Sequence, residues 1–393
     1  MKLNMIKQME RFARSDPSIV SLGQGIPNAP AADMVHARVI EAIRQSSDID
    51  RYSDPLGLPV LRNRIAQLLQ QSGMDYADDE IMVTAGAIEA INATLQTFVT
   101  RNKREVIMPV PTYSAYERAI RCAKGTPVPI RLHAENGWQL DVNAIERAIN
   151  SKTAAILLCN PNNPTGSLYS RETLVRLCEL AKQHRFLLIL DEVYGNMVFG
   201  DGELYSPCVD PAFRKNVVRI VSFSKDFNLT GWRIGFLHAD RHIIEKITPV
   251  HDTLINCAPV ASQYAAMAAL DLHDEIIGNN RKAYEQRRNV MQQYLDDMAE
   301  WLSYTPVQGG YFFFPKLLID VSASKFCYEL MDKAKVIAIP GHDFGTDDTY
   351  IRLCFGRSLQ DIHTGMERIH SYLRRHYSSP VVKLAPKTVV TSV

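Results

Sequence analysis

Several short segments of the sequence carry side chains that could hold a charged ligand. The run Ser222-Phe223-Ser224-Lys225 is followed, eight residues after the lysine, by Arg233, with a glycine turn between the two cations. Asp191 follows an apolar run that predicts a buried strand. Burying a carboxylate at the end of such a strand costs free energy unless a cationic group pairs with it. Residues 160–166 (NPNNPTG) form a turn fixed by two prolines and a glycine, from which an amide side chain can be aimed into a site.

A further segment, residues 84–88, is a candidate phosphate seat. It reads Thr84-Ala85-Gly86-Ala87-Ile88 and opens an expected helix directly after an expected strand. Free backbone N–H groups and the helix dipole at such a position favour a negatively charged ligand.

The elements that must position these segments alternate in type along the middle of the chain. Short apolar runs predict strands at residues 81–84, 105–108, 127–131, 153–158, 186–190, 217–222 and 234–238. Amphipathic runs predict helices at residues 87–98, 114–123 and 171–184. Strands that alternate with helices predict an α/β fold, with a mostly parallel sheet covered on both faces. Ligands of such sheets bind at the carboxyl ends of the strands, where the polar segments lie.

The pattern changes after about residue 259. A long helical stretch runs from residue 262 towards residue 301, and strands near 311–314 and 350–354 alternate with helices at 323–333 and 359–377. We therefore expect a large ligand-binding domain at residues 46–285 and a smaller α+β domain built from both chain ends, residues 1–45 and 286–393. Residues 378–393 show no periodicity, so we expect them to be loosely ordered.

Composition excludes several classes of function. The 393 residues include 44 Lys and Arg against 43 Asp and Glu, so the net charge is close to zero. This balance argues against a protein whose main function is to bind nucleic acid or an anionic membrane. No apolar stretch reaches the roughly 18 residues of a membrane span, and the N-terminus lacks a secretory h-region. The seven cysteines contain no CxxC pair, so we expect a cytoplasmic protein without a disulfide framework or a metal site. No GxGxxG follows a predicted strand, which disfavours a dinucleotide-binding module.

Taken in order, the motifs resemble the class I/II aminotransferase family of the fold-type I pyridoxal-phosphate (PLP) enzymes. The run from Ser222 to Gly235 is similar to that family's lysine signature, and residues 163–166 and 191–194 to its two other hallmarks. The resemblance covers about residue 20 to residue 375 and is specific for fold and cofactor, but less so for substrate. Further matching segments are Tyr52 to Arg62, Pro111 to Tyr116, Gly309 to Phe312, Pro340-Gly341, Phe344-Gly345 and Ile351 to Leu353.

The resemblance implies a role for each side chain around the cofactor ring. Lys225 would form a Schiff base with the cofactor aldehyde and later move a proton. Asp191 would hold the ring nitrogen protonated, so that the ring accepts electrons. Tyr194 and Asn163 would hydrogen-bond to the phenolic oxygen of the ring, and Tyr113 would lie flat against its face.

The resemblance also implies where the phosphate and the substrate bind. Tyr52 in relatives reaches the phosphate of the neighbouring subunit, which implies a homodimer with shared active sites. Arg352 would clamp the substrate α-carboxylate in a bidentate fork, near the amide of Gly25 and the side chain of Asn163. The groups expected at the phosphate of the same subunit are the side chains of Ser222, Ser224 and Arg233 and the amides of Ala87 and Ile88.

The implied reaction is transfer of the α-amino group of an L-amino acid to a 2-oxo acid. Some prokaryotic aspartate aminotransferases carry a lysine beside the phosphate turn, where this chain has Ile88. We therefore expect an aromatic, neutral or basic amino acid rather than a dicarboxylate. Glu10 could meet a basic side chain and His251 could face the pocket, although a solvated carboxylate and a packed helix histidine are the expected readings.

Two alternatives differ in the reaction or in the class of protein. A PLP-dependent lyase or cyclase would eliminate a β or γ group or close a ring, including on arginine-derived substrates of natural-product pathways. The cofactor residues do not separate this alternative from transamination. A regulator that senses the cofactor would carry a DNA-binding domain, for which the resemblance, beginning by residue 20, leaves no room.

Overall fold

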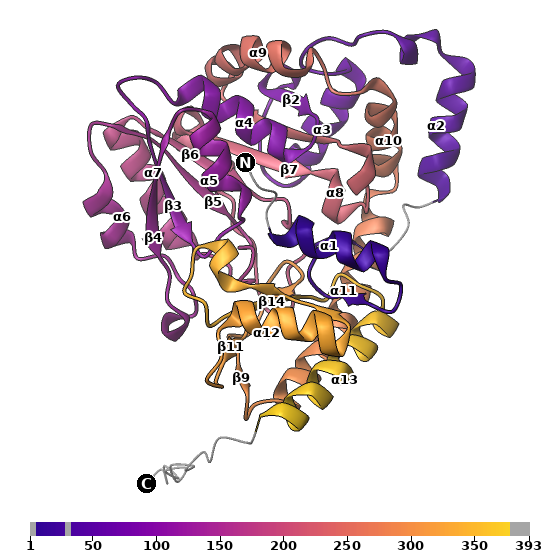
Figure 1. Ribbon diagram of the computed structural model, residues 1–393. Helices are drawn as coiled ribbons and strands as arrows, with labels where there is room; N and C mark the ends of the chain where they lie inside the picture. Colours follow the sequence, from indigo (N-terminus) through magenta and orange to yellow (C-terminus); the bar gives the residue numbers. More distant parts are fainter. Residues whose placement is uncertain (1–4, 28–32, 378–393) are drawn as a thin grey trace, which may run out of the picture.

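A seven-stranded sheet forms the centre of the larger part of the computed structural model, which describes residues 5–27 and 33–377 (Figure 1). Five neighbouring strands are parallel, and β8 runs antiparallel to both of its neighbours, β2 and β7. The fold is therefore α/β with a mostly parallel sheet, as the sequence predicts. In spatial order the strands are β2 (Ile81–Thr84), β8 (Gly235–Ala239), β7 (Val217–Ser222), β6 (Leu187–Asp191), β5 (Thr153–Cys159), β3 (Glu105–Val110) and β4 (Thr126–Arg131).

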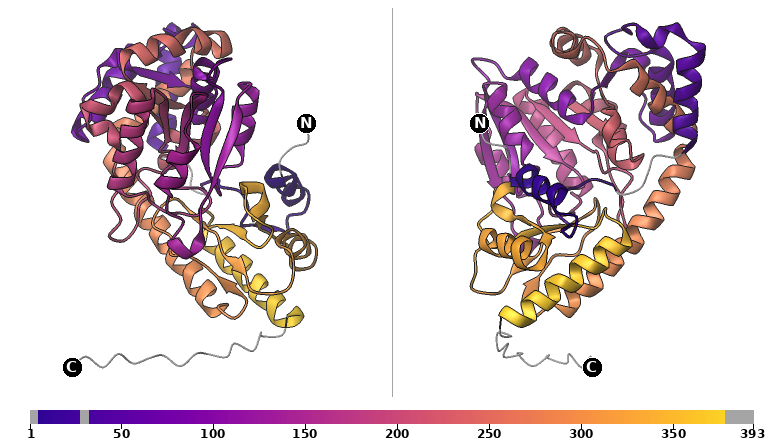
Figure 2. Two further views of the ribbon diagram at one scale, coloured as in Figure 1. Left: turned by 90° about the vertical axis from the view of Figure 1, so that its left-hand side faces the viewer. Right: turned by 45° about the vertical axis from the view of Figure 1, so that its right-hand side comes forward.

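Helices cover both faces of this sheet (Figure 2). On one face α4 (Ala87–Phe98) packs against α5 (Ala115–Cys122) and α9 (Arg241–Ile255), and on the other α6 (Val142–Ala148) packs against α7 (Arg171–His184). Every residue of β5 and β6 is buried. Because both faces of these strands are covered, they are apolar without alternation until Asp191 ends β6.

Most predicted strands and helices lie within two residues of the observed ones, and the helix at residues 171–184 has the predicted bounds. The long stretch expected from residue 262 towards residue 301 is two helices instead, α10 (Val260–Asp271) and α11 (His273–Asp297). The break falls at Leu272, whose φ of −111° and ψ of 19° lie outside the helical region. Two acidic residues follow the break, where the dipole of the new helix favours negative charge.

The helix predicted at residues 323–333 changes from α-helical to π-helical geometry along its length. It is an α-helix, α12 (Ala323–Glu329), that continues as a π-helical turn over Leu330–Ala334. Six α-helices of the described residues form without a prediction: α6, α9, α1 (Met5–Ser15), α2 (Asp33–Gln45), α3 (Pro59–Gln71) and the short α8 (Phe223–Asp226).

Both ends of the chain contribute to the smaller part of the molecule (Figure 1). In it β1 (Val20–Ser21) pairs with β12 (Val336–Ile337), and β14 (Ile351–Cys354) lies between β10 (Phe312–Phe313) and β13 (Ile339–Pro340). The other pair is β9 (Leu302–Ser303) with β11 (Lys316–Leu317), and α13 (Leu359–His376) packs along α11.

The expected boundary at residue 285 falls inside α11, a continuous helix, so the division into domains stays a prediction. The expectation for residues 378–393 lies outside the described residues. No helix in the described ranges is both long and apolar enough to cross a bilayer.

Candidate active site

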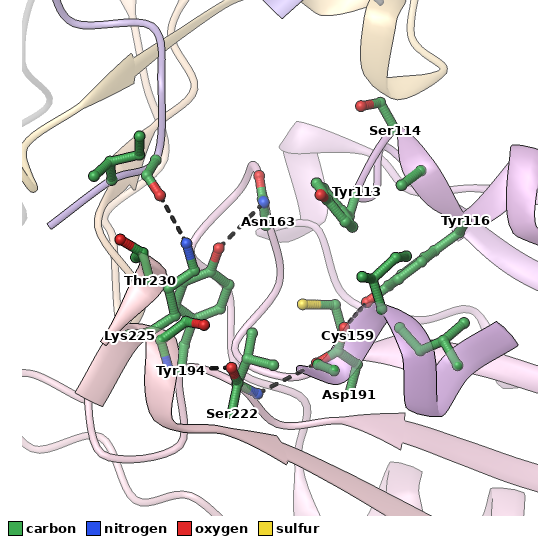
Figure 3. Close-up of a pocket in the computed structure, with 18 of the residues that line it drawn as sticks. Tyr113, Ser114, Tyr116, Cys159, Asn163, Asp191, Tyr194, Ser222, Lys225 and Thr230 are labelled. Carbon is green, nitrogen blue, oxygen red and sulfur yellow. Dashed lines mark hydrogen bonds between the residues drawn. The ribbon is translucent and has the colours of Figure 1, made fainter. Parts of the chain in front are cut away.

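A pocket of about 740 Å³ opens at the carboxyl ends of β5, β6 and β7, within the size range of small-molecule sites (Figure 3). Residues from four parts of the chain line it: the ends of these strands, the first turn of α4, the segment at residues 24–26, and the C-terminal part. Of the residues expected at the site, all but Tyr52 are present in its lining: Gly25, Ala87, Ile88, Tyr113, Asn163, Asp191, Tyr194, Ser222, Ser224, Lys225, Arg233 and Arg352.

Lys225 enters the pocket from α8, directly after β7. Ser222 caps this short helix, because its Oγ accepts a hydrogen bond from the Ser224 amide at 3.1 Å. The Lys225 Nζ donates to the carbonyl oxygen of Gly25 at 2.7 Å. Burial disfavours the charged amine and lowers the pKa of Lys225 to about 8. About a tenth of the amine is therefore neutral at pH 7.

Asp191, at the end of β6, is 3% exposed. Burial raises the pKa of this carboxyl group to about 6, against the opposing effect of two hydrogen bonds. Its Oδ2 accepts the Tyr116 hydroxyl at 2.6 Å and its Oδ1 accepts the Val193 amide at 3.4 Å. Tyr116 was part of a matching motif, but sequence reasoning gave it no role. Its hydroxyl fixes the orientation of the carboxylate.

A chain of hydrogen bonds joins Tyr194, Asn163 and Arg352. The Asn163 Nδ2 donates to the Tyr194 hydroxyl at 3.4 Å, and Nη1 of Arg352 donates to the Asn163 Oδ1 at 3.1 Å. Figure 3 shows Asn163 above the Tyr194 ring, with the Lys225 amine beside them. This chain places a cation, an amide and a phenol along one wall of the pocket.

Arg352 is buried, with only 2% of its surface exposed, and its guanidinium contacts other groups on several sides. Its Nη2 donates to the carbonyl oxygen of Gly23 at 2.6 Å, and the guanidinium carbon lies 4.3 Å from the ring centre of Phe312 and 4.6 Å from that of Phe344. Burial lowers the pKa of Arg352 from an ordinary value at which arginine is always charged. A fixed, buried guanidinium of this kind is suited to a carboxylate.

The turn between β2 and α4 is shaped for an anion. Gly86 sits at the N-cap with a φ of 82° and offers no side chain to cap the first amides of α4. A Cβ at Gly86 would lie 2.8 Å from Nη2 of Arg233, so any other residue would require the guanidinium to shift away from this backbone. Ala87 and Ile88 begin the helix on the same side. Amides, a guanidinium and the Ser222 hydroxyl are the donor set that a phosphate group needs.

Three other sequence candidates lie away from the pocket. Tyr52 is 83% exposed, so the single chain gives it no contact with the site. His251 is a packed helix histidine as expected, since its Nδ1 lies 3.1 Å from Glu89 Oε1 and its Nε2 lies 2.9 Å from the carbonyl oxygen of Pro55. Glu10 is only partly exposed and accepts a hydrogen bond from the Ser21 hydroxyl.

Sequence reasoning missed several residues of the lining. Ser114 and Arg118 on the α5 side are the most informative of these, because they lie one helical turn apart on one face, a spacing that could have been read from the sequence. The other missed residues include Gln24, Ile26, Ile91, Cys159, Val193, Thr230 and Phe312. Within the described ranges, no group of three or more His, Cys, Asp and Glu side chains could hold a metal ion.

The family model and the named relatives to which this chain is similar are those of aminotransferases. The family model for aminotransferase class I and II matches residues 17–369. Aromatic-amino-acid aminotransferase 2 of Thermococcus litoralis is 30% identical over 375 residues, which cover 94% of this chain and 95% of that protein. The aspartate aminotransferase of Pyrococcus abyssi is 31% identical over 377 residues, with the same shares of 94% and 95%. The crystal structure of Pyrococcus protein-A1 has a TM-score of 0.90 at 27% identity and covers 95% of this chain and 97% of that one.

Proposed function

The chain belongs to the class I and II aminotransferase family, and from this premise we propose that it moves the α-amino group of an L-amino acid to a 2-oxo acid using PLP. The observation that carries the proposal is a buried amine, Lys225, in the same pocket as a buried carboxylate, Asp191, and an anion seat at Gly86. These are the three groups that an aldehyde-bearing phosphorylated ring requires of a protein.

The residues present fit the cofactor. Asp191 would face the ring nitrogen, Tyr194 and Asn163 the ring hydroxyl, and Tyr113 the ring face. When bound, PLP supplies an aldehyde that bonds to amines and a protonated ring that accepts electrons. The residues that would hold its phosphate are Ser222, Ser224, Arg233 and the amides of Ala87 and Ile88.

Lys225 would then act as both nucleophile and proton carrier. With a pKa of about 8, its amine is partly neutral at physiological pH and can bond to the cofactor aldehyde. Once the substrate amine has displaced Lys225 from the aldehyde, the free Nζ can remove a proton from the substrate Cα and deliver it to a different atom. Its position beside Tyr194 keeps this proton transfer inside the pocket.

Arg352 and Gly25 would position the substrate. The Nη1 and Nη2 atoms of Arg352 point at neutral oxygens, those of Asn163 and Gly23, so a carboxylate would be a stronger partner for the guanidinium. The side chain of the donor would meet Ile88, an apolar residue on the α4 wall. We therefore propose a donor with an aromatic, neutral or basic side chain rather than a dicarboxylate.

The proposal extends to a cytoplasmic homodimer with shared sites. Tyr52 is 83% exposed, and α2 exposes Met34 (52%), Ile40 (50%) and Ile43 (57%). Apolar residues gathered on one helix at this exposure are typical of a surface that another chain covers. In such a dimer Tyr52 would reach the phosphate in the partner's pocket, and residues 46–285 would form the cofactor-binding domain.

The experiment that tests the reaction uses the holoenzyme with single amino acids and no 2-oxo acid. Transamination predicts about one equivalent of 2-oxo acid per active site, after which turnover stops until an acceptor is added. Continuous release of ammonia, or a cyclised product, would contradict the proposal and support the lyase or cyclase alternative. The family relatives named above are aminotransferases, which does not favour that alternative.

A further inference from the structure

A second acidic residue directly follows each of the two central side chains of the pocket: Glu192 follows Asp191, and Asp226 follows Lys225. Both are buried, with exposed fractions of 0% and 2%, and neither belongs to the described residues that line the pocket. The proposed function gives them no role. Buried carboxyl groups cost free energy unless a donor or a cation compensates them. The groups that compensate them therefore indicate what the two residues contribute.

Arg219 of β7 is the partner of Glu192. Its Nε donates to the Glu192 Oε2 at 2.5 Å, and its side chain is only 12% exposed. The Gly195 amide donates to the Glu192 carbonyl oxygen at 3.0 Å, which closes a turn. A Cβ at Gly195 would lie 3.9 Å from Nη2 of Arg219, so the guanidinium also packs against this turn. The turn contains Tyr194 and follows Asp191, both of which line the pocket, so Arg219 fixes the segment that presents them.

Asn196, the next residue along the chain, joins this turn to α8. Its Nδ2 donates to the Asp226 Oδ2 at 2.8 Å. Asp226 directly follows Lys225 in α8, a helix of only four residues. The same residue is also held by α11, because Asn280 Nδ2 donates to the Asp226 carbonyl oxygen at 2.7 Å. The position of Lys225 relative to the turn therefore depends on the side chain of Asn196.

The charge of Arg219 acts on both buried carboxyl groups. Burial raises the pKa of Asp226 to about 7, against the opposing effects of the Asn196 hydrogen bond and of the Arg219 charge. The remaining carboxyl oxygens, Oε1 of Glu192 and Oδ1 of Asp226, have no hydrogen-bond partner among the described residues. Removal of Arg219 alone would thus leave a buried carboxylate uncompensated. Together Glu192, Asn196, Arg219 and Asp226 form one group, the Arg219 cluster.

We propose that the Arg219 cluster positions the catalytic groups, by holding the turn that carries Tyr194 against the helix that carries Lys225. The inference rests on the proposed function, in which Lys225 moves a proton beside Tyr194. The four members of the cluster are positioning residues, because none of them is among the described residues that line the pocket. The rate depends steeply on how closely the reacting groups are placed, so a loosened cluster lowers the rate without removing any of them.

The first test replaces Asn196, whose exposed position means that the fold is retained. In PLP-free Asn196→Ala, α8 is less tightly held and the Lys225 amine gains contact with water. Modification of Lys225 by trinitrobenzenesulfonate is taken as the difference from a variant that also carries Lys225→Ala. Its half-maximal pH should rise from about 8 by about one unit, which slows the reaction roughly tenfold at pH 7. Asn196→Gln, which keeps an amide donor, should show a smaller rise.

Asn150→Ala is the matched control. Asn150 is also exposed, and its Nδ2 donates to a carboxylate oxygen, Oε2 of Glu105, at the same distance of 2.8 Å. Glu105 begins β3, so this contact lies at the amino end of a strand, away from the edge at which the pocket opens. The control should keep the half-maximal pH and the turnover of the wild type.

Steady-state kinetics of the holoenzyme separate positioning from substrate binding. In Asn196→Ala we expect kcat to fall about tenfold. The KM for the amino donor should change little, because Arg352, proposed to bind the substrate carboxylate, is not part of the cluster.

Arg219→Met combined with Glu192→Gln tests the ion pair. The double substitution removes both charges, so neither is left buried without a partner. It should lower kcat as Asn196→Ala does, and thermal unfolding checks that the variant folds. Arg214→Met combined with Glu80→Gln is its control, since it removes another partly buried ion pair, with Nη2 and Oε2 2.6 Å apart, and should leave kcat unchanged.

The positioning role would be overturned by an Asn196→Ala variant that keeps either the wild-type reactivity of Lys225 or the wild-type kcat. Control variants that lose kcat as the cluster variants do would overturn it as well. A wild type that forms no 2-oxo acid from any amino acid would instead contradict the proposed function. The modification of Lys225 needs neither cofactor nor turnover, so it tests the cluster independently of that function.

Discussion

Burial moves the pKa values of the two central side chains towards each other. The pKa of Asp191 rises to about 6, and that of Lys225 falls to about 8. Above pH 6 the carboxyl group is mainly ionised, and above pH 8 the amine is mainly neutral. Each shift has the same cause, because removing a group from water penalises its charged form. The pocket therefore provides both an anion and a mainly neutral, nucleophilic amine above about pH 8.

The first prediction concerns the amine in the PLP-free protein. The rate at which trinitrobenzenesulfonate modifies Lys225 should follow the neutral fraction, because only the unprotonated amine attacks. Taken as the difference between wild type and Lys225→Ala, this rate should rise with pH and reach half its maximum near pH 8. A rise that continues towards the ordinary lysine value of 10.5 would show that burial does not lower this pKa.

At the scale of elements, the sheet explains why distant segments meet. β5, β6 and β7 are parallel neighbours, so the residues that follow their carboxyl ends gather at one edge. Asn163, Asp191 and Lys225 are brought together in this way. Their approach could be predicted from the sequence, because alternating strands and helices already imply a parallel sheet.

Contacts that cross the molecule could not be predicted from local pattern. Arg352 donates to the carbonyl oxygen of Gly23 across 329 residues of sequence, and Lys225 donates to that of Gly25 across 200. These bonds depend on the pairing of β1 with β12, for which two-residue strands leave almost no periodicity. The antiparallel direction of β8 and the break at Leu272 also depend on tertiary packing rather than on hydrophobic spacing. Arg118 was missed because its spacing from Ser114, although readable from the sequence, does not show that both residues border the same pocket.

The second prediction tests the turn between β2 and α4. Gly86→Ala should weaken PLP binding by about tenfold or more and lower the free energy of unfolding of the PLP-free protein by about 1–3 kcal/mol. The causes are the φ of 82° and a Cβ only 2.8 Å from the Arg233 guanidinium. Cofactor titration and thermal unfolding measure the two effects.

Gly137→Ala is the matched control for this turn. Gly137 also has a positive φ, 69°, but a Cβ there meets no atom within 4 Å. The Gly137→Ala variant should lose stability through backbone strain alone and keep the affinity of the wild type for PLP. Equal loss of PLP affinity in both variants would contradict the assignment of Gly86 to the phosphate seat.

For the whole molecule, the pocket draws on both the central sheet and the two chain ends. Residues 24–26 come from the N-terminal segment, and Phe312 and Arg352 come from the C-terminal part, whereas the remaining lining belongs to the sheet, its helices and the loops that join them. The site therefore forms only when distant parts of the chain are assembled. The one expected site residue outside this assembly is Tyr52, which is 83% exposed and would reach a pocket only in the proposed dimer.

The third prediction concerns that second chain. Ile40→Glu combined with Ile43→Glu should convert the proposed dimer into monomers, because two buried carboxylates without partners would oppose association. Sedimentation velocity measures the change, and activity should fall with it. Tyr328→Glu, at a residue 63% exposed on α12, should leave the assembly unchanged. A wild type that is fully active as a monomer would contradict the shared sites.

The most direct test of the central claim locates the covalent bond between protein and cofactor. Borohydride reduction of the PLP-loaded protein makes the carbon–nitrogen bond permanent, and peptide mass mapping then identifies the modified residue. We predict a single phosphopyridoxyl group on Lys225, and none in Lys225→Ala, which should also lack turnover. A label on another lysine, or a Lys225→Ala variant with undiminished activity, would contradict the account.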